Sequence, residues 1–132
     1  MTNPNSPEAP IVFVCEHGSA KSVVAAAHFN RLAVESGLPY RAVSRGTDPD
    51  PGNHPSAIAG LAADGLDVQS EPRRLMQSDI DAARRVISFG KLPIEYSAGK
   101  VEVWSAPPVS ENYELARTSI VEQARALLDS LA

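Results

Sequence analysis

Cys15 is the side chain in this sequence best suited to covalent chemistry. It follows four apolar residues, "IVFV" at 11–14, and opens the stretch "CEHGSAK" at 15–21, which leads into an alanine-rich segment. If that stretch curls, successive backbone N–H groups point inward and form a nest for an anion. The start of the next helix adds unpaired N–H groups and the positive end of its dipole. One short segment therefore predicts a thiolate nucleophile beside an oxyanion pocket.

The residues next to Cys15 have expected roles in that pocket. Gly18 permits a positive φ or a close approach of the ligand to the backbone. Lys21 supplies positive charge, and the Ser22 hydroxyl is placed either to donate to the sulfur or to cap the helix. The plain alternatives are a buried structural cysteine, a surface lysine and a solvated histidine. The predicted catalytic residues are Cys15, Lys21 and Ser22, and the predicted oxyanion-binding loop is Glu16, His17, Gly18, Ser19, Ala20 and Lys21.

Strands alternate with helices along the chain, and this order must position the loop. The patterns predict strands at 11–14, 40–46, 85–89 and 101–104, and helices at 22–35, at 55–65, from Ser78 and from Ser110. The Ser-x-x-acid form of "SDID" is typical of a helix N-terminus. Alternation of this kind predicts a doubly wound α/β fold, with a parallel sheet covered on both faces. Ligands of such folds bind at the carboxyl ends of the strands, where Cys15 falls.

Composition limits the remaining possibilities. The 132 residues are expected to form one domain over 11–132, after a disordered lead at 1–10 that holds three prolines. A net charge of −4 argues against nucleic acid, and neither a membrane span nor a secretion signal is recognisable. A single cysteine forms no internal disulfide and suits the cytoplasm. No cofactor and no metal site are expected, and the oligomeric state stays open.

Taken together, these motifs resemble the low-molecular-weight protein tyrosine phosphatase family and the related thioredoxin-type arsenate reductases. "VFVCEHGSAKS" matches the family's Cys-x5-Arg-Ser loop in placement, and "VSRGTDP" and "NHPSAIAGLAADGLDV" match the segments that follow. "PPVSENYELARTSI", after Trp104, resembles the acid-bearing loop and the final helix. The resemblance spans residues 11–131. It implies a three-layer α/β/α fold with a central four-stranded parallel sheet, and Cys15 as the nucleophile.

Two catalytic positions depart from the family pattern. Lys21 stands where the family has arginine, so the pocket keeps a positive charge but loses a planar fork that binds two phosphoryl oxygens together. The family's general acid is an aspartate before a proline, and no Asp-Pro occurs in "WSAPPVSEN". Glu111 is the nearest carboxylate and the possible replacement. Asp48 and Asp50 are interpreted as turn residues.

Three functions remain open. The first is a phosphatase that hydrolyses phosphate monoesters through a phosphocysteine, with a phosphorylated substrate as partner. The second is a single-cysteine arsenate reductase. The stretch "VISFGKLPIEYSAGK" holds no resolving cysteine, so that reaction requires an external thiol or a glutaredoxin-like reductant. The third is a non-catalytic module that binds a phosphate-like oxyanion. Ala20 also replaces the second loop cysteine that many of these phosphatases carry.

Overall fold

Four parallel strands form a single sheet in the order β2-β1-β3-β4. The computed structural model describes residues 8–68, 70–99 and 101–131. The strands are β1 (Ile11–Cys15), β2 (Ala42–Gly46), β3 (Arg85–Ser88) and β4 (Val101–Val103). β1 lies between β2 and β3, so Val12 pairs with Val43 on one side and with Val86 on the other. The predicted parallel sheet is confirmed.

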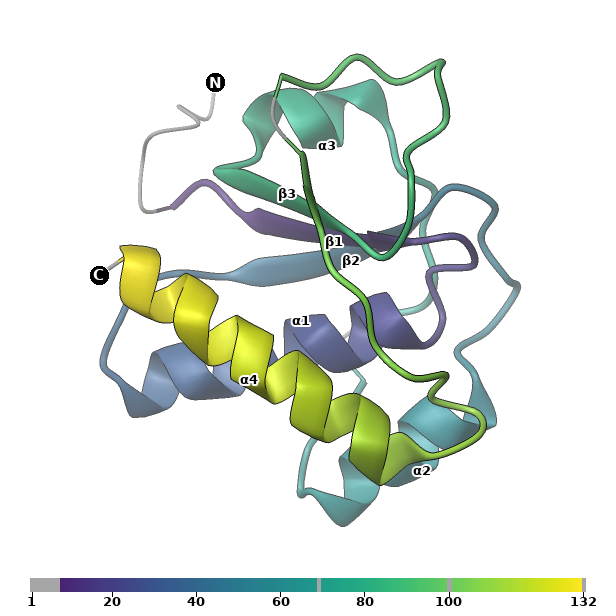
Figure 1. Cartoon of the computed structure of the whole chain (residues 1–132), viewed down its shortest axis with the longest axis vertical. Coiled ribbons are helices and arrows are strands. Elements are labelled where there is room, and N and C mark those ends of the chain that lie inside the picture. Colours follow the sequence, from purple (N-terminus) through teal and green to yellow (C-terminus); the bar gives the residue numbers. More distant parts are fainter. Residues whose placement is uncertain (1–7, 69, 100, 132) are drawn as a thin grey trace.

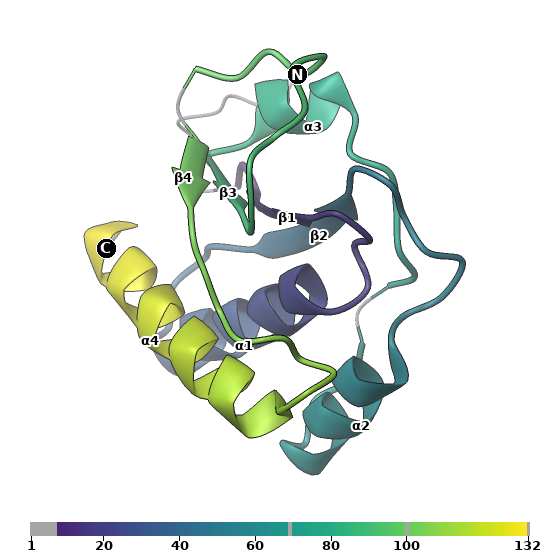
Figure 2. The ribbon, with the colours of Figure 1, turned by 45° about the vertical axis from the view of Figure 1, so that its right-hand side comes forward.

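Helices cover both faces of this sheet. α1 (Lys21–Glu35), α2 (Pro55–Ala63) and α4 (Tyr113–Leu131) lie on one side, and the short α3 (Gln77–Ala82) lies on the other (Figure 1). Figure 2 shows the same three layers from a second direction. This is the predicted three-layer α/β/α architecture. The carboxyl ends of β1 and β2 emerge together at one edge of the molecule, where the loops that follow them meet.

The uninterrupted apolar run of β1 is explained by burial on both faces. Ile11 and Phe13 belong to the larger core, which the sheet forms with α1 and α4. Val12 and Val14 belong to a smaller core under α3. All four are at most 1% exposed, a degree of burial that only a central strand with helices above and below it reaches.

The start of the last helix differs from the prediction. α4 begins at Tyr113 rather than at Ser110. The carbonyl of Pro108 accepts hydrogen bonds from the N–H groups of Glu111 and Asn112, which closes a turn. The Asn112 side chain then accepts from the N–H of Leu115 at 3.1 Å and caps the helix.

The start of α3 also differs, by one residue. The helix begins at Gln77, and the carboxylate of Asp79 accepts from the N–H of Met76 at 2.8 Å. The predicted cap, Ser78, therefore lies inside the first turn. The acid that binds the backbone is Asp79 rather than Asp81, the acid of the predicted pattern, so the capping contact lies two residues earlier along the chain.

Much of the predicted N-terminal lead lies outside the described residues, which begin at Glu8. Ala9 is 1% exposed, and the carbonyl of Pro10 accepts a hydrogen bond from the N–H of Arg84 at 2.8 Å. The division into a lead and a single domain remains a prediction. Within the three described ranges, no helix combines the length and the apolar character that crossing a membrane requires.

A buried polar cluster joins α1, α2 and α4 on the helical side. His28 is 2% exposed, and its Nε2 lies 3.1 Å from the Tyr113 hydroxyl and 3.3 Å from the Asp64 carboxylate. Tyr113 and Arg117 both donate to Asp64, at 2.7 and 2.8 Å. Tyr113 packs so closely on Gly60 that a Cβ there would lie 2.1 Å from the ring.

Charge and burial set the protonation of this cluster. Burial, with Arg31 and Arg117 nearby, lowers the pKa of His28 below its usual 6.5. Burial raises the pKa of Asp64, but the hydrogen bonds from Tyr113 and Arg117 outweigh it and leave that pKa below its usual value. Burial and the bond to Asp64 raise the pKa of Tyr113. At neutral pH the cluster thus holds a neutral imidazole beside a charged carboxylate.

Candidate active site

Cys15 ends β1, and its sulfur faces the first turn of α1. The Sγ atom lies 3.0 Å from the hydroxyl of Ser22. Ser22 is fully buried, whereas Cys15 is partly exposed. The cap position of α1 is Ala20, which makes no side-chain cap bond. Ser22 therefore serves the sulfur rather than the helix cap, and its hydroxyl can stabilise a thiolate.

The backbone around Cys15 offers a row of free hydrogen-bond donors. Among the described residues, the backbone N–H groups from Glu16 to Val23 find no acceptor, and the first such bond in α1 runs from Val24 to the carbonyl of Ala20 at 2.9 Å. Free N–H groups are expected in the first turn of a helix, but here they continue through the whole preceding loop. Such a run of donors is what an anion nest requires.

Two glycines hold this loop against the end of β2. Gly18 has a φ of +61°, and a Cβ there would lie 2.8 Å from the nitrogen of Gly46. A Cβ on Gly46 would in turn lie 2.7 Å from the nitrogen of Gly18. The two backbones thus touch where any side chain would separate them. The sequence analysis predicted special geometry for Gly18 but gave no role to Gly46.

The chain after β2 continues alongside the loop. The N–H groups of Thr47, Asp48 and Asp50 donate to the carbonyls of Cys15, Glu16 and His17, at 3.3, 2.7 and 3.0 Å. The parallel pairing of β1 with β2 is thereby extended past both strands. As a result the 47–50 segment becomes one wall of the site.

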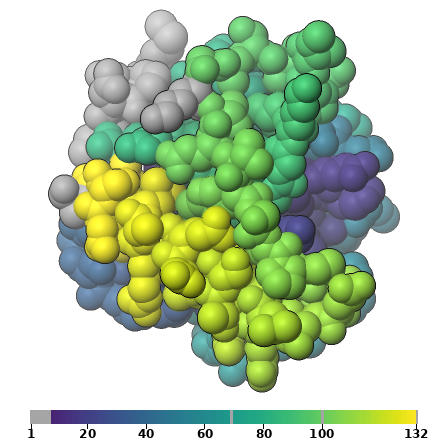
Figure 3. Space-filling model, viewed as in Figure 1, coloured from purple at the N-terminus to yellow at the C-terminus, as the bar shows by residue number. Residues whose placement is uncertain are grey.

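A pocket of about 330 Å³ opens over Cys15. In Figure 3 the surface is hollowed where purple atoms of the loop after β1 meet green atoms of the segment between β4 and α4. The pocket includes six of the predicted loop and catalytic positions and adds six residues from elsewhere in the chain. Its lining is Cys15, Glu16, His17, Ser19, Ala20, Lys21, Asp50, His54, Phe89, Pro108, Val109 and Ser110.

Lys21 is the cation of this pocket. It begins α1 and is partly buried. Across the described residues, no carboxylate lies within 4.0 Å of its ammonium group, although Glu16 and Asp50 line the same pocket. Its charge is therefore available to an anion held at the loop.

The predicted general acid lies outside the pocket. Glu111 is exposed in the turn before α4 and is not a lining residue. Pro108, Val109 and Ser110 are the residues of that segment that line the pocket, and none of them has a carboxylate. The structure thus brings Cys15, Lys21 and Ser22 together but leaves Glu111 apart from them.

Asp50 is, with Glu16, a carboxylate that lines the pocket instead. Its Oδ2 accepts a hydrogen bond from the Ser19 hydroxyl at 2.7 Å, and its Oδ1 lies 3.4 Å from Nδ1 of His17. His17 Nδ1 also lies 3.3 Å from the carbonyl of Asp48. The sequence analysis treated Asp50 as a turn residue and placed His17 in the oxyanion-binding loop, with a solvated side chain as the alternative. The available signal was that Asp50 follows β2, whose carboxyl end lies beside that of β1.

His54 is a further lining residue that the sequence analysis did not identify. Its Nδ1 accepts from the N–H of Ser56 and caps α2, at 3.1 Å, and its own N–H donates to the carbonyl of Ser19 at 2.9 Å. It therefore ties α2 to the loop. Over the described residues, no three histidine, cysteine or carboxylate side chains come together as metal ligands.

Comparison with known proteins gives one family and several similar folds. A family model described as low molecular weight phosphotyrosine protein phosphatase matches residues 10–98. A low molecular weight protein tyrosine phosphatase from T. tengcongensis is 19% identical, with a TM-score of 0.82 over 92% of this chain and 98% of that one. A comparison with curated protein sequences found no match.

Arsenate reductases have the same fold. The enzyme from Archaeoglobus fulgidus is 23% identical, with a TM-score of 0.77 over 90% of this chain and 98% of that one. A thioredoxin-dependent arsenate reductase from Corynebacterium glutamicum is also 23% identical, with a TM-score of 0.75; 96% of this chain is covered, but only 63% of that one. At these identities the likeness establishes the fold and leaves the reaction open.

Proposed function

The chain belongs to the low molecular weight phosphotyrosine protein phosphatase family, and on that premise we propose that it hydrolyses phosphate monoesters through a phosphocysteine intermediate. The observation that carries the proposal is the run of free N–H groups from Glu16 to Val23 around the Cys15 sulfur. A phosphoryl group bound there has its oxygens on backbone donors and its phosphorus within reach of the thiolate. A cytoplasmic location is part of the proposal and is supported by the single cysteine.

The reaction has two steps. The Cys15 thiolate attacks phosphorus, the bond from phosphorus to the leaving oxygen breaks, and that oxygen takes up a proton. Water then attacks phosphorus and gives up a proton to a base, the bond from sulfur to phosphorus breaks, and inorganic phosphate leaves. The backbone donors and Lys21 stabilise the equatorial oxygens in both steps. Ser22 stabilises the thiolate that the second step regenerates.

Replacement of the nucleophile tests this function. We expect Cys15→Ser to reduce aryl phosphate hydrolysis to the uncatalysed rate, because the hydroxyl is not ionised and cannot form the intermediate. Ser22→Ala keeps the nucleophile and is expected to leave a reduced but measurable rate. Equal hydrolysis by wild type and Cys15→Ser contradicts the proposal. Binding of phosphate without any turnover by the wild type selects the non-catalytic oxyanion-binding alternative.

We assign the proton transfer to His17, with Asp50 as its positioning residue. Imidazole gives and takes protons near neutral pH, and both residues line the pocket. Asp50 is itself fixed by the Ser19 hydroxyl at 2.7 Å, so it can orient the His17 ring through Nδ1. Nε2 lies 4.0 Å from a carboxylate oxygen of Glu16, beyond hydrogen-bond distance, and can therefore reach the substrate. A proton donor from the loop after β1, positioned by Asp50 of the 47–50 segment, would replace the Asp-Pro acid that the 105–112 segment lacks.

The leaving group distinguishes proton transfer from a structural role. A general acid contributes about 10²–10⁴-fold, and the contribution is largest when the leaving oxygen is strongly basic. We expect His17→Gln to slow phenyl phosphate hydrolysis far more than 2,4-dinitrophenyl phosphate hydrolysis. Asp50→Asn should show the same pattern to a smaller extent.

Two matched variants control that experiment. Asp48→Asn removes an exposed neighbouring carboxylate whose backbone carbonyl, not its side chain, contacts His17. Glu111→Gln removes the acid that the sequence analysis predicted. Equal losses for both leaving groups in His17→Gln contradict the assignment, and a leaving-group-dependent loss in Glu111→Gln transfers it to Glu111.

Arsenate reduction is the second candidate, and the absence of a carboxylate from 105–112 in the pocket lining favours it. The thiolate would bind arsenate with loss of water, and an external thiol would attack the sulfur of that adduct. Arsenite then leaves with two electrons, and a mixed disulfide forms, which a second thiol reduces. Arsenate-dependent oxidation of glutathione or of a glutaredoxin system measures this activity, and no thiol consumption in either system contradicts it.

A further inference from the structure

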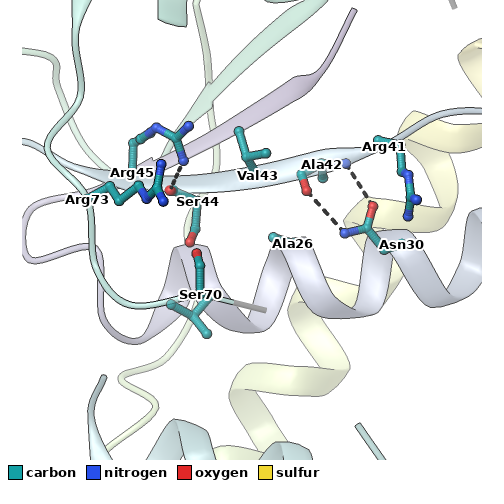
Figure 4. A pocket seen from close by; sticks show the side chains of 10 residues that line it. Ala26, Asn30, Arg41, Ala42, Val43, Ser44, Arg45, Ser70 and Arg73 are labelled. Carbon is teal, nitrogen blue, oxygen red and sulfur yellow. Dashed lines mark hydrogen bonds between the residues drawn. The ribbon is translucent and has the colours of Figure 1, made fainter. Parts of the chain in front are cut away.

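A second pocket, of about 390 Å³, opens beside the outer edge of β2 and shares no lining residue with the Cys15 pocket. It lies between that strand, α1 and the segment that contains Ser70 and Arg73 (Figure 4). Its lining is rich in hydrogen-bond donors and includes no carboxylate. The lining residues are Val23, Ala26, Asn30, Arg41, Ala42, Val43, Ser44, Arg45, Ser70 and Arg73.

Within the described ranges of the chain, one backbone N–H on the exposed edge of β2 finds no acceptor, and it belongs to a residue that lines this pocket. The Asn30 side chain binds both the N–H and the carbonyl of Ala42, at 2.7 and 3.1 Å. At the other end of the strand, Gly46 bonds to the carbonyl of Arg73 and the N–H of Leu75, both at 2.8 Å.

Ser44 lies between those two positions. In the parallel pairing, the backbone N–H and carbonyl groups of Val43 and Arg45 point toward β1. Those of Ser44 therefore point away from β1, toward the exposed edge of the sheet. Its carbonyl accepts from Nη1 of Arg45 at 2.8 Å. Among the described residues, its N–H finds no acceptor. The edge of a sheet is one of the places where such donors form an anion-binding concavity.

The pocket carries the positive charge that binding of an anion requires. Arg45 is neutralised in part by Asp79, whose carboxylate lies 3.3 Å from its Nε. Arg41 and Arg73 have no carboxylate within 4.0 Å among the residues that the structure describes. The chain as a whole carries a net charge of −4, so a cavity with two uncompensated guanidinium groups is not the result of a generally basic surface.

The donors approach the pocket from several directions. Figure 4 shows the hydroxyl groups of Ser44 and Ser70 pointing toward each other, one from β2 and the other from the opposite segment. The Arg73 guanidinium adds a planar fork, which matches two oxygens of a phosphate. We propose that this pocket is a second oxyanion site that binds a phosphate group on Arg73, Ser70 and the backbone N–H of Ser44. A carboxylate, which is planar, would leave part of this donor set unused.

A titration that resolves individual residues tests the site. Inorganic phosphate is added to the isotope-labelled protein, and the amide of Ser44 is followed by NMR. We expect that amide to shift and saturate in the wild type and equally in Lys21→Met, since the two pockets are separate. Arg73→Gln should weaken this binding about tenfold or more, and Ser70→Ala by less. Lys91→Gln removes an exposed charge outside the pocket and should bind as the wild type does.

Titrations with two further compounds identify the class of ligand. Acetate should shift the Ser44 amide only at much higher concentration than phosphate does, and equal affinity for acetate overturns the oxyanion assignment. A short phosphoserine peptide separates the sources: tighter binding than inorganic phosphate indicates a protein-bound phosphate, and weaker binding indicates the free ion. A Ser44 amide that never saturates, or an unchanged titration in Arg73→Gln, overturns the site itself and leaves Arg73 as a charge that protects the edge of the sheet.

Discussion

At the scale of single residues, Lys21 determines how strongly the site can stabilise the transition state of phosphoryl transfer. The backbone donors supply the shape of an anion pocket, but they carry only partial charge. The ammonium group of Lys21 adds a full charge at one point. The arginine guanidinium of the family motif would hydrogen-bond two oxygens and fix the orientation of the phosphoryl group. Lys21 therefore affects the transition state more than it affects binding of the free anion.

Exchange of this residue separates charge from orientation. We expect Lys21→Arg to raise kcat for an aryl phosphate by about 10²-fold, because one transition-state donor contributes on the order of 2–4 kcal/mol. Lys21→Met should lower kcat by a similar factor and weaken inhibition by inorganic phosphate. Steady-state kinetics with both variants measures the two effects. An unchanged kcat in Lys21→Arg would mean that the pocket has no room for the planar guanidinium group.

At the scale of elements, the site depends on the contact between the loop after β1 and the end of β2. Gly18 and Gly46 approach within distances that no Cβ tolerates, and three hydrogen bonds continue the pairing beyond them. This contact sets the position of the 47–50 segment, and hence of Asp50 relative to His17. Substitutions at this contact should thus change both the stability of the fold and the activity of the site.

A methyl group at this junction should be costly. Gly18→Ala places a Cβ 2.8 Å from the Gly46 nitrogen and forces a positive φ, which alone costs about 1–2 kcal/mol. We expect a larger loss of unfolding free energy than in Gly37→Ala, where φ is +68° but no atom lies within 4 Å of the added Cβ. Chemical denaturation of both variants measures the difference. Equal losses would show that the clash relaxes at no cost.

The elements themselves were largely predictable, because their signals are local. The run "IVFV" indicates a strand buried on both faces, and β1 is one. Cys15 and Ser22 are seven residues apart across one turn, so their contact follows from the motif. Ser19 and Asp50 are 31 residues apart, and only the order of the strands brings them together. Periodicity gives no information about which side chain of a turn such as "TDPDPGN" faces inward, so Asp50 was missed.

At the scale of the whole molecule, the buried cluster of His28, Asp64 and Tyr113 joins three helices that are far apart in the sequence. It lies on the side of the sheet that carries the larger core. His28 is nearly inaccessible, and the two arginines near it disfavour a further positive charge. Packing of α1, α2 and α4 therefore depends on this imidazole staying neutral.

The stability of the fold should depend on pH through His28. The unfolded chain takes up a proton on this imidazole near pH 6.5, whereas burial and the nearby arginines lower the folded-state pKa. The contribution is thus complete above about pH 6.5 and is lost as the pH falls toward the folded-state pKa. Thermal unfolding between pH 7.5 and 5.5 should show a smaller pH dependence in His28→Gln. Tyr113→Phe should lower stability yet keep the wild-type pH dependence, and the same slope in wild type and His28→Gln would contradict the assignment.

The lone sulfur beside Ser22 also determines how the protein responds to peroxide. Oxidation of a thiolate first gives a sulfenic acid, which a neighbouring thiol can trap as a disulfide before further oxidation becomes irreversible. With alanine at position 20 and no other cysteine in the 132 residues, the chain offers no such thiol. Recovery after oxidation must therefore come from an external thiol, free or carried by a glutaredoxin-like reductant, that reaches the pocket, so the same opening that admits a phosphorylated substrate also affects the rate of repair.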